Sequence, residues 1–273
     1  MELSRRGFLE AVPGVCAAAG VLGAGSLSRA SGSGGEPGPD AVWPEFPRQK
    51  PEWVQEMVGV CHRDVDRVRE LLNEHPALTN ATWDWGFGDW ETALGAAAHT
   101  GRRNIAELLL ERGARLDIFA AAMLGQTDTV KAMIAAAPGI QRNPGPHGIT
   151  LLAHARAGGE AAKHTLAYLE SLGDADSKPT TEPLTDEQKQ AYIGRFDSPA
   201  LGQGAVEIGL NKNGDLTIAV NGQTLNVLRH AGDHVFFPSG SPAVRVRFTH
   251  SGSGMDALAI VDHVLVTTAT RAS

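Results

Sequence analysis

Aromatic rings and carboxylates are concentrated in one short segment, residues 80–91. Three of the five tryptophans lie there, beside a phenylalanine and three acidic residues. Aromatic faces with carboxylates nearby bind sugars, quaternary amines or the anchor residue of a protein partner. A packed local core is the alternative, because large rings also fold back onto neighbouring helices. The candidate binding residues of this segment are Trp83, Asp84, Trp85, Phe87, Asp89, Trp90 and Glu91.

Several histidines could join these carboxylates. His62 and His99 occupy matching places in consecutive helical segments, and His147 lies near the tip of a rigid stretch of two prolines and two glycines, residues 143–148. His154 follows within the next helical segment. We add His99 and His147 to the residues expected to contact a partner or ligand. With Asp89 and Glu91, these imidazoles have the chemistry of a metal site or an acid–base site.

The spacing of these residues nevertheless predicts no metal and no other cofactor. Neither a His-Glu-x-x-His motif nor a paired cysteine motif is present. Equivalent positions in neighbouring repeats are also too far apart to share one ion unless the loops between them help. We likewise expect no metal at the histidines further along the chain, which are His230, His234, His250 and His263.

The remaining catalytic patterns are missing, and we expect no enzyme. The chain has no Gly-x-Ser-x-Gly elbow, no P-loop and no dinucleotide fingerprint attached to a strand. The weakest hypothesis is a hydrolase that uses Asp89, Glu91 and His147. A pocket that brings these three within hydrogen-bond reach would favour it.

The elements that must position these residues are helix pairs. In residues 92–117 a short alanine-rich helix is expected to lead through a turn at Thr100-Gly101 into a leucine-rich helix that ends at Gly113. Apolar residues at matching places repeat this pattern at Val68, Leu71 and Leu72, at Ile105, Leu108 and Leu109, and at Val130, Met133 and Ile134. One helix pair cannot bury its own apolar face, so repetition predicts a stack that shares these faces.

These segments resemble the ankyrin repeat. Thr92-Ala93-Leu94-Gly95 and Gly113-Ala114-Arg115 are similar to the opening and closing motifs of that family, and residues 148–152 are a further copy. The Pro and His of the opening motif are absent. The resemblance implies stacked helix pairs with protruding turns and a concave face that binds proteins, and it implies no catalytic residues.

The pattern changes from helical to alternating after a proline-containing linker at 177–184. Thr185 is expected to cap a short helix, and short strands separated by turns such as Asn221-Gly222 follow. The sequence therefore predicts a multidomain α plus β chain. It has an ankyrin-type helical solenoid of about four units at residues 52–176 and a small antiparallel β-meander or barrel at 185–270. The stretch Tyr192-Ile193-Gly194-Arg195-Phe196 resembles the start of β-domains appended to secreted bacterial hydrolases.

The N-terminus resembles a twin-arginine export signal. Arg5-Arg6 precedes a mildly apolar run of alanines and glycines, and cleavage after Ala30 would fit the small residues before it. An uncleaved anchor is the alternative. We therefore expect a signal peptide at 1–30, a flexible linker at 31–51, and a periplasmic or secreted mature protein without a stable membrane span. Of the two cysteines, Cys16 would leave with the signal, and Cys61 is expected to be a buried apolar residue.

Charge and composition narrow the choice of partners. The formal net charge is −7, and an acidic surface repels phosphates, so nucleic acid is not expected as a partner. The leading hypothesis is an exported protein–protein interaction module that uses the concave face and the tryptophan-rich segment. The alternative is an accessory factor of a secreted hydrolase system that binds carbohydrate or another small ligand, with Asp84 and Asp89 bonded to hydroxyls.

Overall fold

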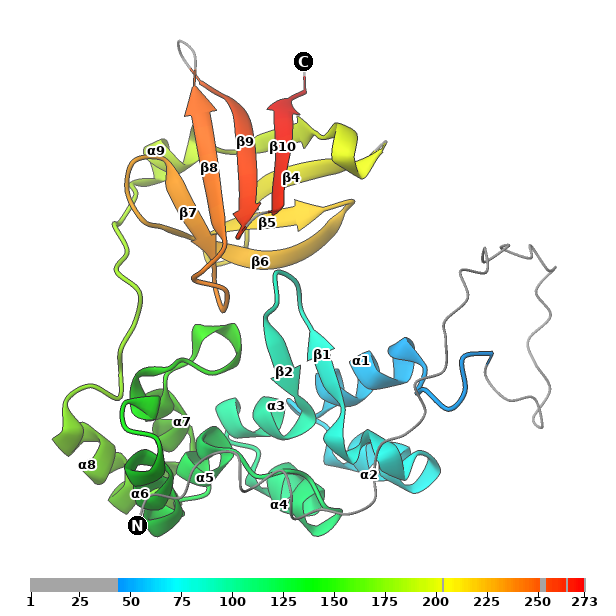
Figure 1. Cartoon of the computed structure of the whole chain (residues 1–273), viewed down its shortest axis with the longest axis vertical. Coiled ribbons are helices and arrows are strands. Elements are labelled where there is room, and N and C mark those ends of the chain that lie inside the picture. Colours follow the sequence, from blue (N-terminus) through cyan, green and yellow to red (C-terminus); the bar gives the residue numbers. More distant parts are fainter. Residues whose placement is uncertain (1–43, 203, 251–253, 264, 273) are drawn as a thin grey trace, which may run out of the picture. The chain divides into compact units, whose positions relative to one another are not determined.

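The computed structural model describes residues 44–202, 204–250, 254–263 and 265–272 (Figure 1). The predicted export signal and most of the 31–51 linker lie outside these residues. The described part contains a helical region followed by a β-barrel (Figure 1). No helix in it is long and apolar enough to cross a membrane.

The helical region consists of four consecutive helix pairs within the described residues. They are α1 (Pro51–Val60) with α2 (Val65–Glu74), α3 (Ala93–His99) with α4 (Arg103–Glu111), α5 (Ile118–Met123) with α6 (Thr127–Ala136), and α7 (Leu151–Ala157) with α8 (Lys163–Leu172). The first helices of successive pairs contact one another, α1 with α3, α3 with α5 and α5 with α7. Adjacent helix pairs therefore pack against one another, whereas a solenoid of about four ankyrin units stays a prediction.

Side-chain caps and small residues explain where these helices begin and how closely they stack. The side chains of Asp64, Thr92, Asp117 and Thr150 each accept a hydrogen bond from a backbone N–H in the first turn of α2, α3, α5 and α7. The alanines of α3 and α5 are buried, as are Val68, Leu71, Leu72, Ile105 and Leu109 from the predicted stripe. Met133 and Ile134 are only partly buried.

Short elements connect the helices, within or between the pairs. They are the 3₁₀ turns η2 (Pro76–Asn80), η3 (Ile140–Arg142), η4 (Pro146–Gly148) and η5 (Gly159–Ala162), and the strands β1 (Thr82–Asp84) and β2 (Trp90–Thr92). β1 and β2 pair antiparallel, with Trp83 opposite Glu91. We call residues 82–92 the finger hairpin. It contains most of the aromatic residues and carboxylates that the sequence singled out.

The second region is a closed antiparallel barrel, which resolves the predicted choice between meander and barrel. The short helix α9 (Asp186–Gln190) precedes it, and η6 (Pro199–Leu201) lies between its first two strands. The strand order is β10-β3-β4-β5-β6-β7-β8-β9. The strands are β3 (Gly194–Asp197), β4 (Ala205–Leu210), β5 (Leu216–Val220), β6 (Gln223–His230), β7 (Val235–Pro238), β8 (Arg245–His250), β9 (Met255–Asp262) and β10 (Leu265–Arg271). Phe196, Val206, Ile218, Phe236 and Val246 belong to its core.

Candidate functional site: a buried carboxylate among imidazoles

The finger hairpin places neighbouring residues in opposite environments. Side chains alternate between the faces of a strand, so Trp90 is 60 % exposed whereas Glu91, the next residue, is fully buried. Gly86, Phe87 and Gly88 all have positive φ angles and form the bend between the two strands. Glycine tolerates this conformation, and the bend returns the chain so that Glu91 lies over the helices.

The other aromatic residues of the hairpin are packed. Trp83 and Trp85 are partly buried against the core of the helical region, and Phe87 packs against the apolar core of the barrel. Asp84 accepts a hydrogen bond from the backbone N–H of Gly86. Of the predicted binding residues in this segment, Trp90 is therefore the large ring that is left exposed.

Glu91 is surrounded by nitrogen atoms. The indole Nε1–H of Trp85 donates to its Oε2 over 2.7 Å. Its Oε1 lies 2.9 Å from Nε2 of His99 and 3.3 Å from Nε2 of His147, and its Oε2 lies 3.5 Å from Nε2 of His62. Sequence separation hides this arrangement, because one imidazole follows α1 and the other two come from α3 and η4.

Asp89 holds His147 in place. The backbone N–H of His147 donates to Oδ1 of Asp89 over 2.8 Å, and Nδ1 of the same residue lies 2.8 Å from Oδ2. His147 has a φ of 58°, and the hydroxyl of Ser239 donates to its carbonyl oxygen over 3.0 Å. Both oxygens of Asp89 thus fix one histidine. We call Asp89, Glu91, His62, His99 and His147 the Glu91 cluster.

The electrostatics of the cluster follow from burial and from these contacts. Burial by itself raises the pKa of Glu91, but the contacts with His147 and His99 outweigh it and lower the pKa to about 2. Burial by itself lowers the pKa of His147, but Asp89 and Glu91 raise it to about 9. Burial is the main reason why the pKa of His62 is lowered. Glu91 acts in the opposite direction and raises this pKa, whereas the neighbouring His99 lowers it further. The shifts at Glu91 and His147 favour a charged carboxylate on Glu91 and a charged imidazole on His147 at neutral pH.

The cluster brings together residues that lie far apart in the sequence. Asp89, Glu91 and His147 do come within hydrogen-bond reach, which is the condition set for the weakest, hydrolytic hypothesis. The rings of His62 and His99 have centroids only 4.9 Å apart, and β2 and η4 supply Glu91 and His147. His154 lies next to this group, with its ring 6.4 Å from that of His99, and burial lowers its pKa to about 4.

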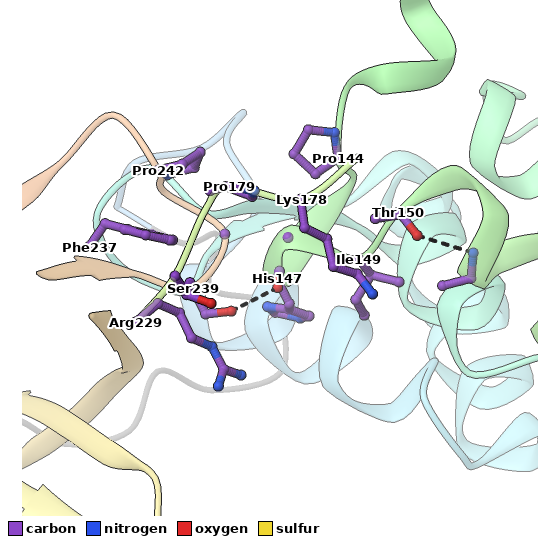
Figure 2. A pocket seen from close by; sticks show the side chains of 14 residues that line it. Pro144, His147, Ile149, Thr150, Lys178, Pro179, Arg229, Phe237, Ser239 and Pro242 are labelled. Carbon is purple, nitrogen blue, oxygen red and sulfur yellow. Dashed lines mark hydrogen bonds between the residues drawn. The ribbon is translucent and has the colours of Figure 1, made fainter. Parts of the chain in front are cut away.

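A pocket of about 470 Å³ lies beside the cluster. Figure 2 shows His147 and Thr150 from the helical region on its wall, with Lys178, Arg229 and Phe237 also lining it. The hydrogen bond from Ser239 to His147 crosses this wall (Figure 2). His147 therefore faces Glu91 and also lines this pocket.

The barrel holds a second group of histidines. Nδ1 of His234 lies 2.8 Å from the hydroxyl of Tyr192, and the ring of His250 is 5.6 Å away. Nδ1 of His230 faces the carbonyl oxygen of Glu182.

Cys61, in the helical region, is fully buried, and burial raises the pKa of its thiol far above the usual range. This confirms it as a buried apolar residue.

Comparisons with known proteins identify a repeat unit that contains Asp89, Glu91 and His99 of the cluster. Residues 89–119 match the family model of the ankyrin repeat. The match begins at Asp89 and includes β2, α3, α4 and the start of α5. No curated protein matches the chain. Ankyrin repeats suggest a protein–protein interaction module, whereas the export signal, the number of repeat units and the resemblance of the barrel to hydrolase-associated domains stay predictions.

Proposed function

We propose that the protein is an exported interaction module that captures a protein or peptide partner through its ankyrin-type region. One observation carries the proposal. Trp90 is 60 % exposed, and it lies inside the segment that matches the ankyrin repeat. Tryptophan is among the residues that most often dominate binding energy at protein interfaces.

The surroundings of Trp90 suit it to this role. It is paired with Asp84 across the finger hairpin, and the neighbouring Glu91 is anchored by Trp85. An anchor residue on a fixed hairpin loses little conformational freedom on binding, so more of its burial contributes to affinity. His99 faces the buried carboxylate of Glu91, so the proposed contact surface consists of Trp90 and the helix faces beside the hairpin.

A carbohydrate-binding role is the alternative, and the contacts favour it less. The exposed ring of Trp90 could stack on a sugar. Asp89, however, uses both carboxylate oxygens to hold His147, and Asp84 accepts a bond from Gly86. Sugar hydroxyls would have to compete with these bonds. The hydrolytic hypothesis meets a similar obstacle, because Nε2 of His147 faces Glu91. We therefore propose no enzymatic activity.

The proposal is tested by capture from a periplasmic extract followed by quantitative mass spectrometry. The Trp90→Ala variant is expected to lose at least one protein that the unaltered protein enriches. Leu265→Ala removes a side chain of similar exposure, 65 %, from the barrel and is the matched control. The same enriched proteins with all three baits would contradict the role of Trp90. Binding to a glycan array that depends on Trp90 would favour the carbohydrate alternative.

Export is a separate part of the proposal and rests on the sequence of residues 1–30. Replacing Arg5 and Arg6 together with lysine is expected to retain the protein in the cytoplasm, because twin-arginine signals are read by their arginine pair. Cell fractionation measures this. Unchanged periplasmic delivery of the double variant would contradict export by this route.

A further inference from the structure

The Glu91 cluster contains two buried atoms that the protein leaves without a hydrogen bond. Oε1 of Glu91 and Nε2 of His99 have no hydrogen-bond partner among the described residues. The two atoms lie 2.9 Å apart but are not aligned for an N–H···O bond. Burying polar atoms without a partner costs free energy, so their convergence calls for an explanation beyond packing.

We propose that His62, Glu91, His99 and His147 bind a transition-metal ion of the zinc class. Each of the four residues offers one ligand atom, and these atoms all lie within 4.8 Å of one another. Four-coordinate zinc with bonds of about 2.0–2.1 Å places its ligand atoms about 3.3 Å apart. The separations from the Glu91 carboxylate to the three imidazoles, 2.9, 3.3 and 3.5 Å, surround that value.

The second nitrogen of two imidazoles is held as a metal site requires. Nδ1 of His62 lies 3.1 Å from the carbonyl oxygens of Val58 and Gly59, which only accept hydrogen bonds, so Nδ1 carries a proton. Nδ1 of His147 likewise faces the carboxylate of Asp89. When each ring is neutral, its lone pair is therefore on Nε2, the atom directed at Glu91. Histidines that bind metals commonly donate their other N–H to a carboxylate or a backbone carbonyl.

The ligand set points to the class of ion. Imidazole nitrogens suit zinc, copper, nickel and iron, whereas calcium and magnesium take oxygen ligands. Three imidazoles and one carboxylate complete a tetrahedron, which is the arrangement of a structural zinc site and leaves no open position for a substrate. This inference goes beyond the proposed interaction function and does not depend on it, because Trp90 points away from the cluster.

The role of such an ion follows from where its ligands come from. His62 follows α1, Glu91 lies on β2, His99 ends α3, and His147 lies in η4. One ion would bind the finger hairpin, two helix pairs and a more distant connecting segment to one another. Since the ion would bind the folded arrangement and not the unfolded chain, it would raise the stability of the helical region.

The test is zinc binding by the full chain, purified, stripped with a chelator and dialysed against zinc. We expect about one zinc per chain, and a higher melting temperature than for the stripped protein. Cobalt in place of zinc should give the visible absorption of a tetrahedral site and quench tryptophan emission, because the indole of Trp85 bonds Glu91. These readings on the unaltered protein hold even if a variant fails to fold.

Variants identify the ligands. Glu91→Gln keeps the shape of the side chain, and His62→Ala alters a partly exposed ring; both should lose the zinc. Asp89→Asn removes the acceptor that orients His147, and we expect zinc affinity about 10- to 100-fold lower. His250→Ala, which removes an exposed barrel histidine, is the matched control and should bind zinc normally. No zinc in the unaltered protein, zinc that survives Glu91→Gln, or zinc that is lost in His250→Ala would each overturn the proposal.

Discussion

The protein contains two groups of histidines, one under the finger hairpin and one in the barrel, and they differ in what the imidazoles face. In the Glu91 cluster, His147 lies between two carboxylates and His99 meets a fully buried one. In the barrel, His234 meets the neutral hydroxyl of Tyr192. The imidazole rings are similarly close in the two groups. The ring centroids of His62 and His99 are 4.9 Å apart, and those of His234 and His250 are 5.6 Å apart. The buried charge, and not ring spacing, separates the two groups.

Removal of that charge should have the largest effect. In the chelator-treated protein, Glu91→Ala leaves the indole N–H of Trp85 without its acceptor and a charged His147 without one of its two carboxylates. Breaking a buried ion pair on one side costs about 3–5 kcal/mol, so we expect a loss of that size in the free energy of unfolding. Urea titration followed by circular dichroism measures it. A loss below about 1 kcal/mol would mean that the cluster is solvated and weak.

An intermediate effect is expected at the carboxylate that orients His147. Asp89→Asn keeps the size of the side chain but replaces charged acceptors with a neutral amide. Hydrogen bonds to charged groups contribute about 1.5–3 kcal/mol, and we expect a loss of about 2 kcal/mol in the free energy of unfolding under the same conditions. Asp84→Asn is the control within the hairpin, because its hydrogen bond to Gly86 is local. An equal loss for both variants would contradict a special role for Asp89.

The barrel should give the smallest effect. Tyr192→Phe removes only the hydroxyl that faces His234, and a neutral hydrogen bond contributes about 1 kcal/mol net. We expect a loss of that order in the free energy of unfolding, with the ring still packed against Phe236 and Phe248. Differential scanning calorimetry can measure the change on the same chain. A loss as large as that of Glu91→Ala would erase the distinction between the two groups.

Local sequence signals predicted much of the framework. The apolar stripe of α2 and the alanines of α3 and α5 are buried as expected, and in the stripe of α4 only Leu108 is partly exposed. Thr185 caps α9 through a reciprocal bond with Gln188, and the strands after it close into a barrel. The helix caps, the apolar stripes and the single strands depend on residues near one another in the chain, where periodicity and capping act directly, whereas closure of the barrel pairs β3 with the distant β10.

The assembly of the site could not be predicted in the same way. The alternation of β2 buries Glu91 and exposes Trp90, but the sequence did not show that residues 82–92 form a strand pair. His147 reaches the cluster because its positive φ and its two bonds to Asp89 turn the segment inward. Such convergence depends on the path of two connecting segments in space, and no periodic pattern encodes it. All the residues of the cluster were nevertheless singled out by their chemical type.

The distance along the chain between His62 and His147 also constrains how the protein is made. During synthesis Glu91 emerges from the ribosome before His99 and long before His147. Until His147 is free, the carboxylate has only part of its final set of partners, so closing the nascent hairpin over it would bury a poorly compensated charge. The first helix pairs can form early, whereas the hairpin closes over Glu91 only after His147 has been synthesised.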